Sequence, residues 1–147
     1  METKLKTPAV EFSYFRLSLL SYLRDMHPDK ADDMDFIATR GDAAASAYSE
    51  TIKSGHSHHE AEEISSQILY EGLHFSVYRT IINILWEEFS EELDLSESED
   101  LAIILLPRLS DTISKYTLSD DFVNTPEYSQ LYTELTGEIQ IRFEDGI

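Results

Sequence analysis

The sequence predicts an all-α fold, in which residues 1–147 form a single multihelical domain of about six helices. Apolar residues recur every three or four positions along most of the chain, which is the pattern of a helix with one buried face. Capping residues precede nearly all of these segments. The chain has 147 residues, of which 41% are hydrophobic, and no cysteine. A chain of this length buries enough apolar surface to fold without disulfides.

Two helices are expected in the first 55 residues. The first begins at Thr7–Pro8 and ends at His27–Pro28, because proline suits the first helical position and disfavours helix in the residue before it. The pair Asp32–Asp33 caps the second helix, and Gly55 ends it. Gly41 makes the second apolar face thin enough for another helix to approach closely. The two apolar faces are Phe12, Phe15, Leu19, Tyr22, Leu23 and Met26, and then Met34, Ile37, Ala38, Gly41, Ala45, Tyr48 and Ile52.

A third and a fourth helix occupy the middle of the chain. Ser57 and Glu60 have the capping-box spacing that opens the third helix, which continues to about Gly72. Ser76 can cap the fourth helix, over residues 77–89. Apolar side chains cover more than half of its circumference, so we expect it to contact several neighbours. They are Val77, Tyr78, Ile81, Ile82, Ile84, Leu85, Trp86 and Phe89.

A fifth helix follows a second capping-box pattern at Ser96–Glu99. Pro107 should kink or split it, because proline lacks an amide donor and crowds the preceding turn. A short buried strand over residues 101–106 is the competing interpretation, since a short apolar run fits both structures.

The last helix opens at Thr125–Pro126 and runs through Gly137, where glycine costs about 1 kcal/mol relative to alanine. The alternation of Ile139, Ile141 and Phe143 also fits a short strand at the C-terminus. We favour the helix, whose apolar face consists of Tyr128, Leu131, Tyr132, Leu135, Ile139 and Phe143.

Acidic residues dominate the charge of the chain. The formal net charge is −18, and residues 54–107 carry twelve acidic side chains against one basic residue, Arg79. Nucleic-acid phosphates and anionic membranes repel such a chain, so we expect no direct binding to either. The expected partner is another protein, with a basic surface, and a homodimer is left open. The sequence shows no secretory signal or membrane span, so a cytoplasmic location is expected.

The candidates for an interaction surface are Glu87, Glu88, Glu91, Glu92 and Trp86. We expect the four glutamates in the last turns of the fourth helix, where each carboxylate faces the negative end of the helix dipole at a cost of about 0.3–1 kcal/mol. Charge in an unfavourable place can mark a functional surface, although a solvated helix face is the simpler interpretation. Trp86 is the only tryptophan. Core packing is its default role, and exposure would make it an interface anchor.

His56, His58, His59 and Glu63 are weak metal-ligand candidates at the start of the third helix. His59 and Glu63 are four residues apart and can reach one ion, but a zinc site needs three or four ligands and the neighbouring helix offers no obvious addition. We therefore expect no metal and no cofactor. The sequence has no G-x-S-x-G elbow, glycine-rich phosphate loop, H-E-x-x-H motif or calcium loop. No catalytic residue is predicted, and the chain is expected not to be an enzyme.

Several packing stretches, considered together, carry a family resemblance. They are Tyr14–Arg24 with His27–Pro28, Gly72–Ser76, Ile84–Phe89, Leu105–Pro107 and Tyr128–Gly137. Through them nearly the whole chain resembles an uncharacterised Bacteroidetes family of small helical domains of unknown function, often found on conjugative transposons. The resemblance implies an all-helical fold, a bacterial cytoplasmic setting and a mobile-element context. It supplies no catalytic residue.

Three functions are compatible with these observations, in decreasing order of preference. The first is a non-enzymatic acidic protein-interaction domain, because the acidic middle of the chain lies beside a broadly apolar helix. The second is a DNA mimic that inhibits a nucleic-acid-binding protein, which would need carboxylates spaced like phosphates. The third is a metal-binding protein that uses the His56–His59 region.

Overall fold

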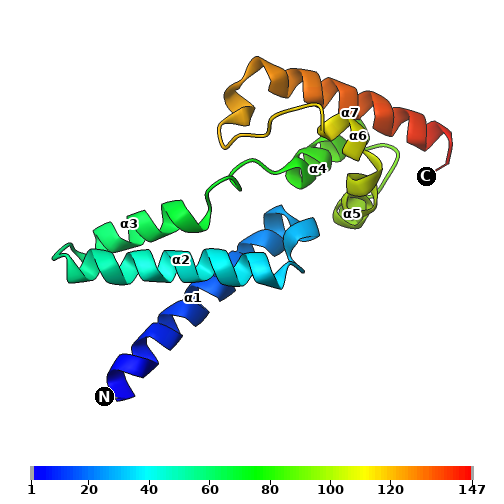
Figure 1. Cartoon of the computed structure of the whole chain (residues 1–147). Coiled ribbons are helices and arrows are strands. Elements are labelled where there is room, and N and C mark those ends of the chain that lie inside the picture. The colour runs from blue at the N-terminus through cyan, green and yellow to red at the C-terminus, as the bar shows by residue number, and fades with distance from the viewer. Residues whose placement is uncertain (1, 147) are drawn as a thin grey trace. The chain divides into compact units, whose positions relative to one another are not determined.

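Every regular element of the computed structural model is a helix (Figure 1), which confirms the all-α prediction. The structure describes the backbone of residues 2–146 and the side chains of residues 13–146. Over that range it contains seven α helices, three short 3₁₀ helices and no strand. The chain divides into two compact units, residues 1–71 and 72–147, which are described separately. That residues 1–147 form a single domain stays a prediction.

The first unit consists of α1 (Glu2–Met26), the 3₁₀ helix η1 (Pro28–Lys30), α2 (Met34–Lys53) and α3 (His58–Leu69). The second unit consists of α4 (Val77–Glu88), η2 (Leu95–Glu97), α5 (Ser98–Arg108), α6 (Ser110–Ile113), η3 (Phe122–Asn124) and α7 (Pro126–Glu144). None of the helices in the described range combines the length and apolarity needed to cross a bilayer.

α1 begins earlier than its sequence signal. It starts at Glu2, so the predicted start at Thr7–Pro8 is wrong, and it ends at Met26, where the prediction placed the stop. Residues 2–6 include glutamate, lysine and leucine, which are strong helix formers and extend the helix ahead of the cap signal. The side chain of Phe12, assigned to the apolar face from the sequence, lies outside the described side chains.

Twelve of the apolar-face residues predicted on α1 and α2 lie in the range of described side chains, and six of them are buried while five are half-buried. The buried members are Phe15, Leu19, Leu23, Ile37, Gly41 and Ala45. Met34 is an exception, because it occupies the first position of α2, ahead of the buried part of the helix, and its side chain is exposed.

α1 and α2 cross each other (Figure 1), and Gly41 of α2, which has no side chain, lies against Arg16 of α1. A Cβ atom added to Gly41 would lie 2.8 Å from Cγ of Arg16 and 3.1 Å from its backbone nitrogen. The predicted close approach of another helix is therefore confirmed. Beside the crossing, the Arg16 guanidinium donates to both carboxylate oxygens of Asp42, at 2.9 and 2.7 Å. This bidentate geometry holds the two helices in one register.

The connections before and after α2 follow the predicted caps. Asp33 accepts a hydrogen bond from the backbone N–H of Phe36 at 3.1 Å. Ser57 and Glu60 form the predicted capping box, with both reciprocal hydrogen bonds present. Gly55 has a φ angle of +93°, in the left-handed region that glycine adopts most easily after a helix.

Arg40 of α2 closes the C-terminal end of α3. Its guanidinium donates to the carbonyl oxygens of Ile68, Leu69 and Glu71, at 3.2, 3.2 and 2.7 Å. The last carbonyls of a helix lack intrahelical donors, and the helix dipole favours a positive charge beside them. The guanidinium also lies over the ring of Phe36, 4.9 Å from its centroid.

α4 is the centre of the second unit, as its broad apolar coverage predicted. Seven of its twelve residues are buried, and Ser76 caps its start by accepting from the backbone N–H of Arg79 at 3.0 Å. α5 and α7, with the residue that joins α5 to α6, supply much of the surrounding core through Ala102, Leu105, Leu109, Leu131, Leu135 and Ile139. Trp86 does not join this core.

The fifth predicted helix is split near its proline. α5 ends at Arg108 and α6 begins at Ser110, so Pro107 interrupts the helix as predicted. The competing strand over residues 101–106 is wrong, because this segment forms helical hydrogen bonds. The capping box predicted at Ser96–Glu99 is also wrong. Asp94 and Glu97, which have the same spacing two positions earlier, form it instead.

α7 is one continuous helix through Gly137, so the alternative of a short C-terminal strand is wrong. Leu131, Leu135 and Ile139 are buried, at the four-residue spacing of a helix face, whereas Ile141 is exposed. Because burial follows the helical period here, the alternation that suggested a strand does not mark a buried face.

Gly41→Ala is expected to destabilise the protein by about 1–3 kcal/mol, the usual cost of forcing volume into a close contact. The same substitution at Gly137, where an added Cβ meets nothing within 4 Å, should stabilise it by about 0.5–1 kcal/mol because alanine favours helix. Urea unfolding of both variants measures the two effects. Effects of the same sign would contradict the close contact at Gly41.

Candidate functional site

Eight of the twelve acidic side chains in residues 54–107 lie between the last turn of α4 and the first turn of α5. Residues 87–100 are termed the acidic strip. Its eight acidic residues are all exposed, and they are Glu87, Glu88, Glu91, Glu92, Asp94, Glu97, Glu99 and Asp100. The sequence has no basic residue between Arg79 and Arg108. Among the described side chains, one ion pair reaches the strip, from Arg79 Nη1 to Glu99 Oε2 at 3.9 Å.

Two of the four predicted glutamates lie beyond the helix. α4 ends at Glu88, and Glu91 and Glu92 follow it in a turn, so the expectation that all four face the helix dipole is wrong for these two. The buried Phe89 leaves the helical conformation, and its ring stacks on Phe143 with the ring centroids 5.0 Å apart. α4 therefore ends before Glu91 and Glu92, next to the residue whose ring is buried against α7.

Tyr132 of α7 holds the two glutamates that remain in α4. Its hydroxyl oxygen lies 2.8 Å from Oε1 of Glu87 and 3.1 Å from Oε2 of Glu88. Partial burial, followed by the two carboxylates, raises the pKa of Tyr132, so the hydroxyl keeps its proton and donates it. Sequence reasoning treated Tyr132 only as an apolar face residue, because no local signal links it to residues 44 and 45 positions away.

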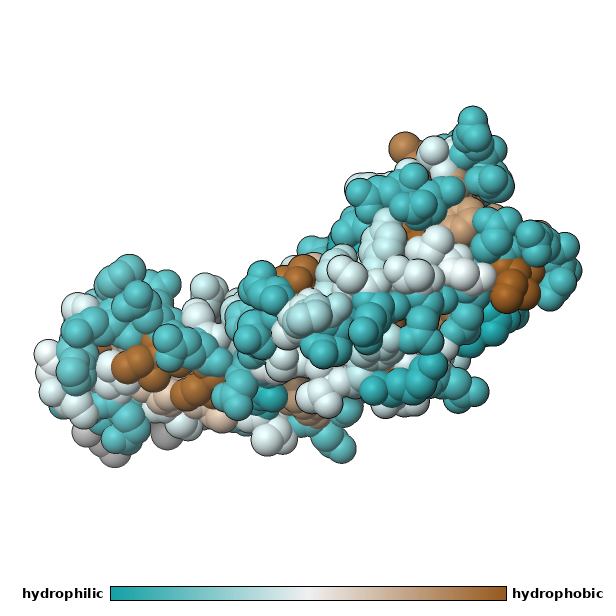
Figure 2. Space-filling view, turned by 90° about the horizontal axis from the view of Figure 1, so that it is seen from above, coloured by the Kyte–Doolittle hydropathy of each residue, from teal (hydrophilic) through white to brown (hydrophobic). Residues whose placement is uncertain are grey.

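Trp86 immediately precedes the acidic strip and is 46% exposed. Core packing, the default interpretation, is therefore wrong for this side chain, although its neighbours Ile84 and Leu85 are fully buried. Figure 2 shows a largely hydrophilic surface on the face in view, with apolar side chains in separate small patches. Exposure is the condition under which a lone tryptophan becomes a candidate anchor for a partner.

The three histidines at the start of α3 lie beside three different residues. His56 Nδ1 lies 3.5 Å from Oε1 of Glu60, and His59 Nε2 lies 3.8 Å from Oε2 of Glu63. His58 Nδ1 is 2.7 Å from the hydroxyl oxygen of Tyr48. Within the described residues, no group of three or more histidine, aspartate and glutamate side chains is placed to hold a metal ion.

A second feature, which the sequence did not indicate, is a hollow of about 490 Å³ beside α7. It is termed the C-terminal pocket, and it is lined by Lys115, Tyr116, Thr117, Phe122, Thr125, Glu127, Gln130 and Glu134. These residues come from the segment after α6, from η3 and its cap, and from α7. They meet only when the chain folds, so no local motif could have identified them.

One carboxylate organises the polar groups of this pocket. Glu134 accepts from Lys115 Nζ at 2.7 Å and from the hydroxyl of Tyr116. These two donors lower the pKa of Glu134, and the bond to Glu134 raises the pKa of Tyr116 to about 12. Tyr116 therefore stays protonated near neutral pH and is a poor general base. The arrangement suits ligand binding better than proton transfer.

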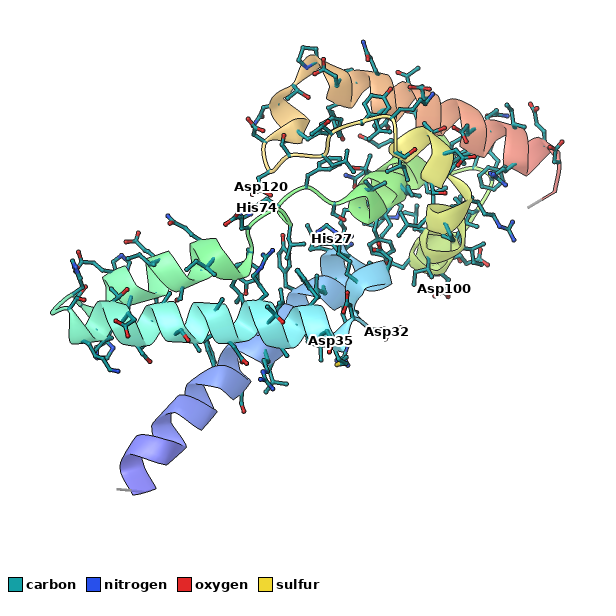
Figure 3. All side chains as sticks on the ribbon, in the orientation of Figure 1. His27, Asp32, Asp35, His74, Asp100 and Asp120 are labelled. Atoms are coloured by element: carbon teal, nitrogen blue, oxygen red, sulfur yellow. The ribbon has the colours of Figure 1, made fainter. Side chains whose placement is uncertain are left out.

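Asp120 holds the loop that borders the pocket. Its carboxylate accepts from the backbone N–H groups of Gly72 at 2.9 Å and His74 at 3.1 Å. Figure 3 shows the labelled Asp120 and His74 close together, and Nε2 of His74 lies 4.0 Å from Oδ2 of Asp120. Two residues further on, the ring of Phe122 packs on Phe75 with the centroids 4.9 Å apart. These contacts fix the floor of the pocket.

Glu134→Gln tests the electrostatic role of this carboxylate. A carboxylate whose pKa is lowered by folding stabilises the fold above its unfolded-state pKa, and this contribution is lost as the pH falls through the lowered pKa. The variant should melt at a lower temperature than the wild type near pH 7, and the difference should disappear towards about pH 3.

Calorimetry across this pH range measures both melting temperatures. Glu144→Gln, at an exposed position at the end of the same helix, is the control and should show no such pH-dependent difference. A deficit in Glu134→Gln that persists unchanged in acid would contradict the charged interaction.

Comparisons with known proteins identify a family but no activity. The family model described as a domain of unknown function, DUF1896, matches residues 7–146. The crystal structure of protein PG0816 from Porphyromonas gingivalis is similar, with 44% sequence identity, a TM-score of 0.89 and coverage of 95% of each chain. No protein with a curated description matches. The helical architecture and the match over almost the whole length place this chain in the DUF1896 family of domains of unknown function.

Proposed function

We propose that this chain is a non-enzymatic interaction domain that binds a basic protein through the acidic strip and Trp86. The observation that carries the proposal is the pairing of eight exposed acidic residues, reached by one ion pair among the described side chains, with an exposed tryptophan at their edge. The carboxylates would supply attraction and selectivity, and the indole would supply apolar contact area.

The charge distribution supports a basic partner. The second unit has four basic and sixteen acidic side chains, a formal net charge of −12. Uncompensated charge of one sign raises the local potential and accelerates encounter with a partner of the opposite sign. The same field repels nucleic acid, so the expected ligand is a protein with clustered lysine and arginine.

The Tyr132 bonds to Glu87 and Glu88 add a degree of order to this surface. Both carboxylates lie within hydrogen-bond distance of one hydroxyl oxygen, so fewer side-chain conformations must be lost when a partner binds. The hydroxyl has one proton to donate to these carboxylates, so most of their oxygen atoms remain available to a cation. The two ends of the proposed surface differ in how their carboxylates are held. Glu87 and Glu88 lie in α4 beside Tyr132, whereas Glu91 and Glu92 follow the helix in a turn.

The mobile-element context implied by the family resemblance makes proteins encoded beside this chain the first candidate partners. A DNA mimic would use the same carboxylates against the groove of a nucleic-acid-binding protein. Competition by duplex DNA distinguishes that alternative, because DNA would displace the chain from such a protein. Self-association would appear as a change in light scattering without any partner.

Replacing Glu87, Glu88, Glu91 and Glu92 by glutamine should weaken binding of a lysine- and arginine-rich peptide about tenfold, the combined effect of several surface charges. Glutamine can still accept from Tyr132, so the fold should persist. Fluorescence of Trp86, the only tryptophan, reports binding beside the strip. Binding by the unmodified chain should also weaken as salt rises.

The matched control replaces Glu50, Glu62, Glu63 and Glu71 by glutamine, which changes the net charge equally at exposed positions of the first unit. This variant should retain most of the affinity. If both variants lost the same amount of affinity for the peptide, the overall net charge would explain the binding and the acidic strip would have no specific role. Peptide binding that salt and both variants leave unaffected would exclude the acidic strip as the binding surface.

A further inference from the structure

We propose that the C-terminal pocket receives the arginine or lysine side chain of a partner, an inference that rests on the proposed basic partner. The pocket and the acidic strip belong to the same unit and use different residues. The strip would attract a basic protein, and the pocket would select one cationic side chain from it.

Two aromatic rings give the pocket its apolar surface. Phe122 is buried beneath the pocket and forms its floor, and Tyr116 is half-buried beside it. Their ring centroids are 6.0 Å apart and their planes meet at 78°, so the rings form a corner. Such a corner can pack against the alkyl stem of lysine or arginine, and a ring face attracts the charged end.

The charges of the lining favour a cation. Lys115 and the two carboxylates of Glu127 and Glu134 give the lining a formal charge of −1. Glu134 is already bonded to Lys115 and Tyr116. Glu127 is exposed, lines the pocket and is close enough to Tyr116 to raise the pKa of that hydroxyl, so its carboxylate can meet a ligand in the same space. An anionic ligand would be repelled by both carboxylates.

The molecule already places one ammonium group in this pocket. Lys115 Nζ lies 2.7 Å from Glu134 Oε2, which shows that an ammonium fits against this carboxylate in the presence of the Tyr116 ring. A ligand cation would take the corresponding position on Glu127. Lys115 would oppose it by repulsion, so removing this charge should improve binding.

The hollow continues along α7, which favours a side chain attached to a polypeptide over a small inorganic ion. A second depression of about 460 Å³ is lined by Ser129, Gln130, Thr133 and Glu134. It shares Gln130 and Glu134 with the C-terminal pocket. The backbone of a partner could follow this depression while its cationic side chain enters the pocket.

Two-dimensional NMR titration with N-acetylarginine amide and N-acetyllysine amide tests the inference without any partner protein. Amide shifts should move in residues 115–134, and the neutral isostere N-acetylcitrulline amide should leave them unchanged. Glu127→Gln should weaken binding roughly two- to fivefold, whereas Lys115→Gln should strengthen it by a similar factor. Glu144→Gln is the control and should change little.

Citrulline shifts equal to those of arginine would overturn the inference, because a neutral group would then suffice. Shifts confined to residues 86–100 would also overturn it, while supporting the acidic strip as a cation-binding surface. Conversely, binding in the pocket that survives replacement of Glu87, Glu88, Glu91 and Glu92 would support the pocket even if the strip binds no partner. These outcomes distinguish a failure of the pocket proposal from a failure of the acidic-strip proposal.

Discussion

α4 carries apolar side chains over more than half of its circumference, and the second unit is arranged to cover them. Ile81, Ile82, Ile84 and Leu85 have no exposed surface, and burial of each such side chain contributes roughly 1.5–3 kcal/mol. α5 and α7 provide much of the cover. The last buried residue of α4 is Leu85, and the acidic strip begins two residues later, at Glu87.

The carboxylates of the second unit fall into two groups with different physical roles. Glu134 and Asp120 bond to donors that fix local structure, and Asp94 and Glu97 build the capping box ahead of α5. Other acidic residues of the strip, such as Glu91 and Glu92, lie exposed in the turn after α4, and among the described residues the structure assigns their carboxylates no role in holding the fold. Carboxylates of this second group repel the other negative charges of a strongly acidic chain and so destabilise the folded state. This destabilisation is the reason for proposing that they bind a partner.

The sequence predicted the individual helices better than it predicted the contacts between them. Periodicity and caps located the end of α1, the start of α2, the capping box of α3 and the break near Pro107, because each depends on neighbours within a few residues. The bonds of Arg40 to the end of α3, of Tyr132 to α4 and of Lys115 to Glu134 join residues between 19 and 45 positions apart. Local patterns contain no information about such contacts. For the candidate site, the sequence supplied the glutamates and the tryptophan but neither the C-terminal pocket nor the true end of α4.

The two ends of α3 are closed by groups of opposite charge, and this has a directional consequence. At the N-terminal end the Glu60 carboxylate completes the capping box, and its bonds to Ser57 lower the pKa of Glu60. Acid protonates this carboxylate and so removes a negative charge that the helix N-terminus favours. At the other end Arg40 donates to backbone carbonyl oxygens, so no carboxylate takes part in closing that end. α3 should therefore unwind in acid from its histidine end, and amide hydrogens near Leu69 should be the last in this helix to exchange with solvent.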